Sequence, residues 1–146
     1  MIRFKCITEE NFDSIIQMKR PENERFVASN SVSLAQAWLY RDDDDVFPFA
    51  IYKEEQVVGF MMLEEDDEAP DLILWRMMVA PDQEGKGYGS EAVRLLIRLA
   101  RESGKYEGIN LICHPENHAA RHIYDKLGFV PTGKILYGDV ELRLVL

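Results

Sequence analysis

The sequence predicts a single α/β domain over residues 1–146, with a mixed sheet of about seven strands flanked by four helices. Two observations lead to this prediction. Segments that alternate apolar and polar residues are interspersed with segments of helical periodicity, in the order strand, helix, helix, three strands, helix, strand, helix, two strands. A chain of 146 residues that is 47% hydrophobic is also long enough to bury one substantial core.

The chain begins with signals for one strand and two helices. Residues 2–6 alternate in the manner of a strand, and Thr8 is a suitable cap for a helix after it. The apolar face of this helix is predicted to contain Phe12, Ile15 and Ile16. A second helix is indicated by Ser33 and Gln36, which have the spacing of a capping box. Its inward-facing residues are predicted to be Ala35, Trp38 and Leu39.

Three strands come next in the chain. They are predicted over residues 46–52, 57–63 and 72–79. The first two are joined tightly through Glu54 and Glu55, which predicts an antiparallel meander. The acidic runs at 42–45 and 64–68 are interpreted as loops between strands.

The second half of the chain contains two further helices and three strands. A long helix follows a glycine-rich loop and stops at Gly104. Its apolar residues at helical spacing are Ala92, Val93, Leu96, Ile97 and Ala100. Residues 109–113 predict a short strand, a further helix ends at Gly128, and residues 129–136 and 140–146 close the chain as strands.

The charge of the chain is distributed unevenly. Residues 1–70 hold 16 acids and 7 bases, whereas residues 71–146 hold 10 of each, so the whole charge of −9 belongs to the first part. Without a cluster of Lys and Arg, no nucleic-acid partner is expected. No apolar run approaches the roughly 20 residues that span a bilayer, so we expect no membrane partner and a cytoplasmic location. Cys6 and Cys113 are expected to be reduced thiols of the core type.

Gly85, Gly87 and Gly89 lie in a loop between an apolar strand and a helix. Their backbone N–H groups can converge on a phosphate, and the helix N-terminus adds partial positive charge. A Walker A loop is excluded because Lys86 is followed by Gly87 rather than by Ser or Thr, and the meander before the loop disfavours a dinucleotide-binding fold. A flexible turn that binds no phosphate is the alternative.

At this loop the sequence resembles a known family. Residues 79–90 are similar to the acetyl-CoA pyrophosphate loop of the GNAT N-acetyltransferase superfamily, whose pattern is Gln/Arg-x-x-Gly-x-Gly/Ala. Alignment on Gly87 and Gly89 places Glu84 at the first position of that pattern, which is a departure from it. Gln83 lies one residue early, so either the loop is shifted or the backbone N–H groups hold the phosphates with less help from a side chain.

Two further similarities support this resemblance. The late helix of the family has a pattern that is matched here by Asn117, Ala120, Tyr124, Gly128 and Phe129. A narrower resemblance, to the bacterial spermine/spermidine acetyltransferase branch, is carried by residues 26–36, 74–77 and 137–146.

The resemblance implies a GNAT fold that is splayed between the fourth and fifth strands. It also implies an N-acetyltransferase that transfers the acetyl group of acetyl-CoA directly to a primary amine, such as that of the polyamines spermidine or spermine. The alternatives are another amine (an amino acid, an aminoglycoside-like compound or a protein Lys) and a non-catalytic acetyl-CoA-binding module. The implied cofactor-binding residues are Met77, Met78, Val79, Gly85, Lys86, Gly87, Tyr88, Gly89, Ser90, Asn117, Ala120 and Tyr124. The apolar strand 140–146 could serve a homodimer interface as well as a core.

Tyr124 is the candidate general acid. An alkylamine with a pKa of about 10.4 must lose a proton before it attacks, and a thiolate whose conjugate thiol has a pKa of about 8.5 leaves faster beside an acid. By the resemblance, Tyr124 is that acid; the alternative is aromatic packing on a helix face. The family's oxyanion donor is a backbone N–H where the fourth strand bulges, here that of Met78 or Val79. Asn117 could cap the last helix, contact the pantetheine arm, or do both.

Three acidic residues are candidates for binding the acceptor amine, namely Glu24, Glu64 and Glu141. Glu64 is also the preferred general base, because it ends the strand next to the proposed cofactor strand. Each of the three could instead be a solvated charge, and a chain of water molecules could replace a single base. The acidic first half of the chain would attract a small cationic amine.

Three histidines raise the question of a metal site. His114, His118 and His122 recur every four residues beside Cys113, which would suit a metal if one helix carried them. Pro115 disfavours helix at His114, and such a site needs further ligands. We therefore predict that these residues bind no metal.

Overall fold

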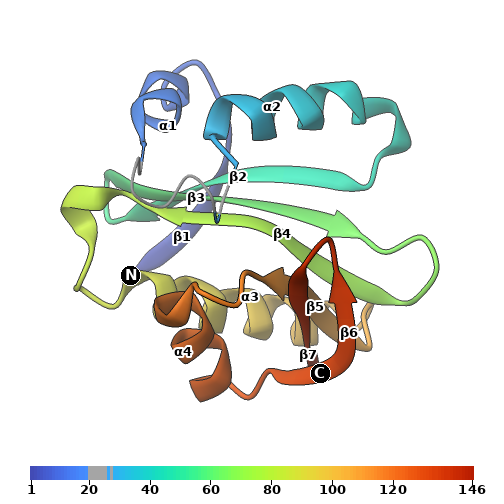
Figure 1. The fold of residues 1–146 in the computed structure, drawn as a ribbon. Coiled ribbons are helices and arrows are strands. Elements are labelled where there is room, and N and C mark those ends of the chain that lie inside the picture. Colours follow the sequence, from blue (N-terminus) through green and yellow to red (C-terminus); the bar gives the residue numbers. More distant parts are fainter. Residues whose placement is uncertain (20–25, 27) are drawn as a thin grey trace.

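The computed structural model describes residues 1–19, 26 and 28–146 and arranges seven strands in one mixed sheet (Figure 1). The strands are β1 Ile2–Cys6, β2 Val46–Lys53, β3 Gln56–Glu65, β4 Asp71–Val79, β5 Gly108–Cys113, β6 Val130–Leu136 and β7 Asp139–Val145. Their order across the sheet is β1-β2-β3-β4-β5-β7-β6. The predicted mixed sheet of seven strands is therefore confirmed.

Helices cover both faces of this sheet (Figure 1). The α-helices are α1 Phe12–Gln17, α2 Asn30–Leu39, α3 Tyr88–Ser103 and α4 His118–Lys126. Short 3₁₀ turns are formed by Arg41–Asp43 and Pro81–Gln83. The α1 and α2 helices lie on one face and α3 and α4 on the other. The order of strands and helices along the chain is the predicted one. No helix among the described residues is long and apolar enough to cross a membrane.

The sheet is divided between β4 and β5. The β2–β3 and β3–β4 pairs are antiparallel, as the meander predicted, whereas β4 and β5 run parallel. Their pairing is short: it joins Asp71, Leu72 and Ile73 of β4 to the first three residues of β5 and then stops. Beyond Ile73 the two strands separate, which confirms the expected splay.

A buried ion pair holds the closed end of this splay. The Asp71 carboxylate is 5% exposed and accepts two hydrogen bonds from Arg143 on β7, from Nε at 2.7 Å and from Nη2 at 2.8 Å. Asn110 on β5 donates a third hydrogen bond at 3.3 Å. A Cβ atom on Gly108 would lie 2.6 Å from Arg143 Nη2, so only glycine leaves room for the guanidinium. Strands β4, β5 and β7 are thus tied together where the separation begins.

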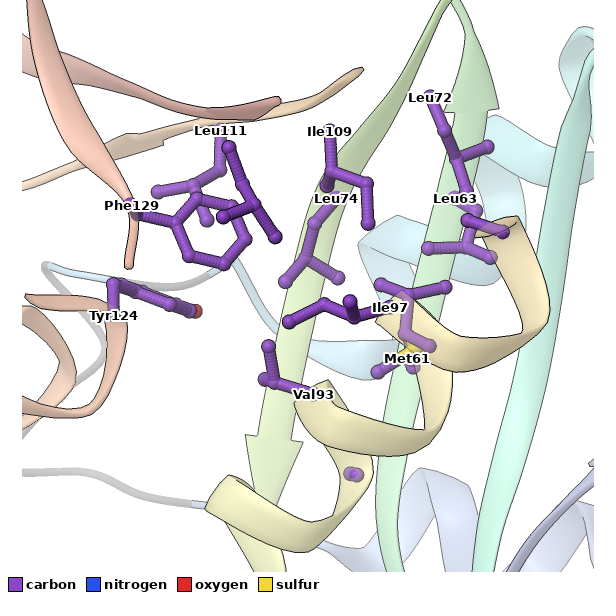
Figure 2. Close-up of a cluster of buried hydrophobic side chains, with 14 of the residues drawn as sticks. Met61, Leu63, Leu72, Leu74, Val93, Ile97, Ile109, Leu111, Tyr124 and Phe129 are labelled. Atoms are coloured by element: carbon purple, nitrogen blue, oxygen red, sulfur yellow. The ribbon is translucent and has the colours of Figure 1, made fainter. Parts of the chain in front are cut away.

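The core consists of two clusters, one on each face of the sheet. The larger cluster lies against α3 and α4 and includes Met61, Val93, Ile97 and Tyr124 (Figure 2). The smaller cluster lies under α1 and α2 and includes Phe60, next in sequence to Met61. Because β3 buries side chains on both faces, it reads as a continuous apolar run rather than as an alternating strand.

The orientation predicted for α2 is wrong. Ser33 is not the N-cap: the helix begins earlier, after Ser29, whose side chain accepts a hydrogen bond from the Val32 N–H. Trp38 and Leu39 were expected to face inward, but they are 65% and 61% exposed. Ala35, also expected inward, is exposed as well. The inward residues of α2 are Asn30, Ser33, Leu34 and Ala37.

The start of the chain differs from prediction in three details. Helix α1 begins after Asn11, which is buried. The Asn11 side chain accepts a hydrogen bond from the Thr8 N–H and donates one to the Cys6 carbonyl. Thr8 thus takes part through its backbone, and its side chain does not cap the helix. Phe12 is 46% exposed because it lies on the outer side of this short helix. Cys6 is exposed at the end of β1 and is not a core thiol, whereas Cys113 is buried as expected.

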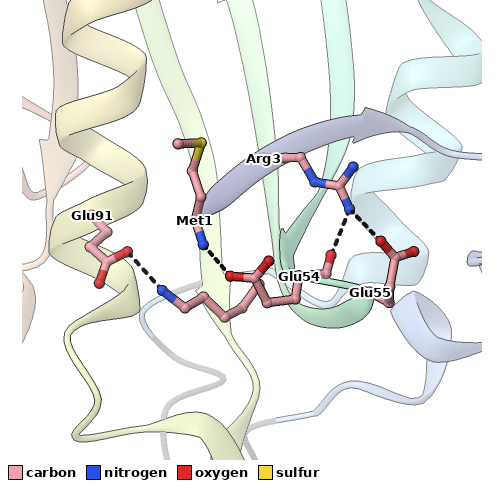
Figure 3. A network of polar contacts seen from close by, with 6 residues as sticks. Met1, Arg3, Glu54, Glu55 and Glu91 are labelled. Carbon is pink, nitrogen blue, oxygen red and sulfur yellow. Dashed lines mark hydrogen bonds and ion pairs between the residues drawn. The ribbon is translucent and has the colours of Figure 1, made fainter.

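Polar contacts connect β1 to the β2–β3 hairpin, and β2 to α3 (Figure 3). Arg3 Nη2 donates to the Glu54 carbonyl oxygen at 2.6 Å, and the Met1 amine contacts the Glu54 carboxylate. Lys53 Nζ lies 3.6 Å from a carboxylate oxygen of Glu91 on α3. These groups orient the edge of the sheet. Because they are solvent-exposed, they contribute little to its stability.

Candidate active site

A cavity of about 870 Å³ opens where β4 and β5 separate. Its walls come from residues 74–79 of β4, from residues 111–114 at the end of β5, from α4, and from residues 28–31 at the start of α2. These elements lie on both faces of the sheet. A molecule that enters from the α3–α4 side can therefore meet one that enters from the α1–α2 side.

The glycine-rich loop adopts a backbone that its glycines make accessible. Gly85 and Gly87 have φ angles of 77° and 81°, in the left-handed region that side chains disfavour. Gly87 is the N-cap of α3, and no side chain caps this end of the helix. The N–H groups of the first helical turn, those of Tyr88, Gly89 and Ser90, have no acceptor within the helix. They form a donor cluster at the positive end of the helix dipole.

The side chains around this loop differ in their burial and contacts. A Cβ atom on Gly89 would lie 3.5 Å from Ile123 Cδ1 and 3.6 Å from Val79 Cγ2, so this buried glycine sits where α3, α4 and β4 approach one another. Gln83 is 7% exposed and accepts a hydrogen bond from Lys86 Nζ at 3.1 Å. Glu84, at the position where the family pattern has Gln or Arg, is exposed.

The last residues of β4 present alternate backbone groups to the gap. The Ala80 N–H bonds the Val58 carbonyl of β3 at 2.8 Å, and the Met78 carbonyl is 2.5 Å from the position of a Cβ on Gly59. Met78 therefore directs its backbone groups toward β3. In an antiparallel ladder the neighbouring residues direct theirs the opposite way, so Met77 and Val79 face the side where β5 has separated.

The bulge of β4 lies earlier than the sequence resemblance placed it. In the pairing of β3 with β4, Met62 is opposite Arg76 and Leu63 is opposite Leu74, which leaves Trp75 as the extra residue. The prediction had placed the bulge at Met78 or Val79. An extra residue increases the local twist of a strand, so its position just after Ile73 accounts for the separation of β4 from β5.

Tyr124 lines the cavity from α4. It is 7% exposed, and its ring packs edge-on against Phe129 at 5.6 Å between centroids (Figure 2). Its hydroxyl forms no hydrogen bond with any residue that the structure describes. Burial raises the pKa of Tyr124 well above that of a free phenol, with a smaller contribution from the neighbouring Cys113 thiol. The hydroxyl is therefore a protonated donor at neutral pH.

Asn117 and the histidines are located on and before α4. Asn117 is the N-cap of this helix, and its Oδ1 accepts a hydrogen bond from the Ala120 N–H at 3.3 Å. Asn117 and Ala120 also line the cavity. His114 precedes the helix, which begins at His118, so the three histidines do not share one helical face. Among the described residues there is no group of three His, Cys, Asp or Glu that could hold a metal ion.

The cavity brings together only some of the predicted site residues. Those that line it are Met77, Met78, Val79, Gly89, Asn117, Ala120 and Tyr124. The rest of the loop set, Gly85, Lys86, Gly87, Tyr88 and Ser90, lies beyond its lining, next to Gly89.

The acidic candidates for the acceptor site are placed less favourably. Glu64 does not line the cavity; it pairs with Ile73 across β3 and β4, and burial together with Asp45 raises its pKa. Glu141 lies on β7 and accepts a hydrogen bond from Thr132 Oγ1 at 2.8 Å, also outside the lining. Glu24 lies outside the described residues. The acids that do line the cavity among the described residues are Glu116 and Asp139.

Comparison with known proteins identifies the family. Residues 12–129 match the family model described as Acetyltransferase (GNAT) family. The chain belongs to the GNAT acetyltransferase family. The match covers most of the sheet, the glycine-rich loop and Tyr124, and the splayed sheet is the fold of its structural relatives.

Several proteins similar to this GNAT protein carry names of N-acetyltransferases. It is 26% identical over 150 residues to a protein named spermine/spermidine N(1)-acetyltransferase of Bacillus subtilis strain 168, covering 98% of this chain and 97% of that one. Spermidine N-acetyltransferase from Vibrio cholerae, solved with CoA and spermine, has a TM-score of 0.80 at 16% identity, over 99% of this chain and 95% of that one. An aminoglycoside acetyltransferase solved with coenzyme A has a TM-score of 0.82, also at 16% identity and the same coverage. This GNAT protein is accordingly an acetyl-CoA-dependent N-acetyltransferase.

Among the cavity-lining residues that sequence reasoning missed are three with polar or charged side chains, Arg76, Asn30 and Asp139. Arg76 lies within the apolar run of β4, and a single cation in such a run is a signal that could have drawn attention to it. Asn30 is 2% exposed on the inner face of α2. It was missed because the orientation predicted for that helix was wrong. Asp139 begins β7 and approaches the cavity only through the long-range pairing of β7 with β5.

Proposed function

We propose that this GNAT enzyme acetylates the primary amine of a small acceptor, and that a polyamine such as spermidine or spermine is the first acceptor to test. The observation that carries the proposal is one cavity lined by Gly89 of the donor cluster, by the gap-facing edge of β4 and by Tyr124. The names of the relatives support a polyamine, but an identity of 26% does not fix the acceptor. An amino acid is the second candidate, and the Arg76 side chain favours it.

The residues present fit acetyl-CoA. On this proposal the N–H groups of the loop from Gly85 to Ser90 hold its pyrophosphate, as helix N-termini hold anions. The gap-facing N–H and C=O groups of Met77 and Val79 hold its pantetheine arm like an added strand. Acetyl-CoA supplies an activated acetyl group as a thioester.

Tyr124 then serves as general acid, and Val79 rather than Met78 supplies the oxyanion donor. A buried phenol that stays protonated can deliver its proton to the departing sulfur. The Val79 N–H faces the gap, whereas that of Met78 faces β3. Asp139 joins Glu64 as a candidate to receive the proton of the amine, because it lines the cavity.

Thiol release from acetyl-CoA tests this proposal, measured over polyamines, amino acids and basic peptides with the wild type and the Tyr124→Phe variant. We expect turnover with at least one acceptor, and a loss of kcat in the variant of about 100-fold or more, because general acid catalysis contributes at least that much. The Kd of acetyl-CoA, measured by calorimetry, should be nearly unchanged.

Two further results separate the alternatives. Because the pKa of Tyr124 is raised, wild-type activity should show no loss from tyrosine ionisation up to about pH 10. The variant Tyr106→Phe, a partly buried tyrosine that does not line the cavity, is the matched control and should retain full activity. Binding of acetyl-CoA without turnover of any acceptor would instead indicate a non-catalytic binding module.

A further inference from the structure

Arg76 is a partly buried cation on the α1–α2 side of the cavity, and no described residue gives it an anionic partner. Its Nη2 donates to Gln36 Oε1 at 3.2 Å, and its Nη1 makes a long contact of 3.4 Å with the Trp75 carbonyl oxygen. Its Nε is buried and has no hydrogen-bond partner. The guanidinium also lies 4.9 Å from the centroid of the Trp75 ring. It forms no ion pair within the part of the chain that the structure describes.

A partly buried cation that lacks an anion is energetically unfavourable unless a bound ligand supplies the missing acceptors. Burial lowers the pKa of Arg76, which is the direction expected when the charged form loses water without gaining an anion. A guanidinium has five N–H donors in a planar fork, and a carboxylate matches two of them at once. Among the described residues, Arg76 has two weak neutral acceptors, the Gln36 side chain and the Trp75 carbonyl.

The neighbouring wall of the cavity is also suited to an anion. Helix α2 begins here, and Asn30 and Ser31 of its first turn line the cavity, so the positive end of the helix dipole points at it. Lys19 lines the same wall. The acidic residues in the described lining, Glu116 and Asp139, come from the opposite wall, after β5 and at the start of β7.

A second unsatisfied group lies beside this cationic wall. Asn30 is 2% exposed and donates from Nδ2 to the Ile15 carbonyl at 3.0 Å, but its Oδ1 has no partner. A buried amide oxygen of this kind needs an N–H donor. Because this oxygen is closed off from solvent, what the cavity offers to a ligand is the group of cations, which suits a carboxylate.

We propose that Arg76 and the N-terminus of α2 bind a carboxylate of the acceptor, so that the acceptor is an amino acid or another amine that carries a carboxylate. This inference rests on the proposed acetyl transfer and narrows its acceptor. A polyamine, in contrast, leaves Arg76 unpaired and brings a second cation close to it, which costs free energy.

The test compares acceptors that differ only in the carboxylate. Initial rates are measured with phenylalanine and phenethylamine, with methionine and its decarboxylated amine, and with spermidine. Charge-assisted hydrogen bonds to a carboxylate predict that kcat/KM favours each amino acid over its amine by about 10- to 100-fold. Arg76→Gln should abolish this preference by lowering kcat/KM for the amino acids by about 10- to 100-fold.

Controls separate recognition of the acceptor from other roles of Arg76. Arg98→Gln removes an exposed cation on α3 and should leave the preference intact. Arg76→Lys keeps the charge but not the fork, and should keep only part of the preference. The Kd of acetyl-CoA should be the same in all variants. Melting curves establish that Arg76→Gln is folded, and direct titration of the amino acid into the enzyme with CoA bound gives a second reading of the same site.

Three outcomes would each overturn the inference, and each leads to a different conclusion. Turnover that is equal for amino acids and amines, or fastest with spermidine and indifferent to Arg76→Gln, removes the carboxylate site and leaves the proposed acetyl transfer standing. Weaker acetyl-CoA binding in Arg76→Gln assigns the residue to the cofactor instead. Intact acetyl-CoA binding without turnover of any acceptor removes both proposals together.

Discussion

At the scale of single residues, Asp71 shows how one side chain can determine the shape of a whole sheet. Its carboxylate connects three strands, because it bonds Arg143 on β7 through two oxygens and Asn110 on β5. The Asp71 side chain is 6% exposed and that of Arg143 is 33% exposed, so water screens only one side of the pair. The Asp71 charge therefore has a structural role where β4 and β5 begin to separate, and no role in the proposed reaction.

We predict that Asp71→Asn lowers the free energy of unfolding by about 2–3 kcal/mol at pH 7, since it leaves a partly buried guanidinium without its anion. Arg143 holds the pKa of Asp71 below its ordinary value of about 3.9. The stabilisation is therefore present above about pH 4 and is lost as the pH falls through the lowered pKa of the folded state. Urea unfolding of both proteins over this pH range measures the effect, and the two curves should converge at low pH.

The exposed pair of Arg121 and Asp125 provides the control for this prediction. These residues are one turn apart on α4, with 2.8 Å between Arg121 Nε and Asp125 Oδ1. Because both side chains are in contact with solvent, Asp125→Asn should change the unfolding free energy far less. An equal loss in both variants would show that burial of Asp71 is not what makes its ion pair stabilising.

At the scale of elements, α3 carries a left-handed glycine at each end. Gly87 precedes the helix with φ 81°, and Gly104 follows it with φ 66°. A Cβ atom on either glycine would meet nothing within 4 Å, so substitution by alanine strains the backbone without any steric clash. The two positions differ in their surroundings: only Gly87 belongs to the donor cluster proposed to hold pyrophosphate.

Gly87→Ala and Gly104→Ala should therefore have the same effect on stability and different effects on binding. Each should lower the unfolding free energy by about 1 kcal/mol, the cost of placing a non-glycine residue in the left-handed region. The Kd of acetyl-CoA, measured by calorimetry, should rise several-fold for Gly87→Ala and remain unchanged for Gly104→Ala. A similar rise in both variants would attribute the effect to loss of folding rather than to the loop.

The elements also show which features can be predicted from sequence. The glycine-rich loop and the last helix are local patterns, in which the residues that perform the chemistry are also those that set the backbone, so both could be located. Helix α2 could not be oriented, because its buried face contains Asn30 and Ser33 while its apolar Trp38 and Leu39 are exposed. An inference that apolar residues point inward fails where a polar face lines a ligand cavity.

Long-range contacts set the other limit. Asp71 and Arg143 are 72 residues apart in the chain, and nothing near either residue indicates the other. The position of the bulge at Trp75 likewise depends on the register of β3 against β4. Arg76 could be seen in the sequence as a cation within an apolar strand, but the positions of its neighbours were needed to show that no described residue pairs with it as an acid.

At the scale of the whole molecule, the two acidic runs come together away from the cavity. The Glu65 N–H bonds the Asp45 carbonyl at 2.8 Å, which brings residues 42–45 close to residues 64–68. Burial, with Asp67 and Asp43 next in importance, raises the pKa of Asp45. None of the nine acids in these two runs lines the cavity, so on the proposed function they act on an acceptor through the overall field of the protein rather than by contact.

This arrangement predicts how salt affects each class of acceptor. A polycation such as spermidine is attracted by the net negative charge, so its kcat/KM should fall several-fold between roughly 0.05 and 0.5 M NaCl. A zwitterionic amino acid has no net charge, and its kcat/KM should change little over the same range. Initial rates at fixed acetyl-CoA concentration measure both. A salt-independent rate with spermidine would mean that the acidic half has no part in its capture.

The separation of β4 from β5 has a consequence for solubility. Unpaired strand edges are the surfaces on which other chains add strands and begin to aggregate, and most sheets carry them only at their margins. Here such edges also lie inside the sheet, along the last residues of β4 and β5. On the proposed function the pantetheine arm covers the β4 edge, so the metabolite protects the protein from self-association, and its supply in the cell affects how much of the protein stays soluble.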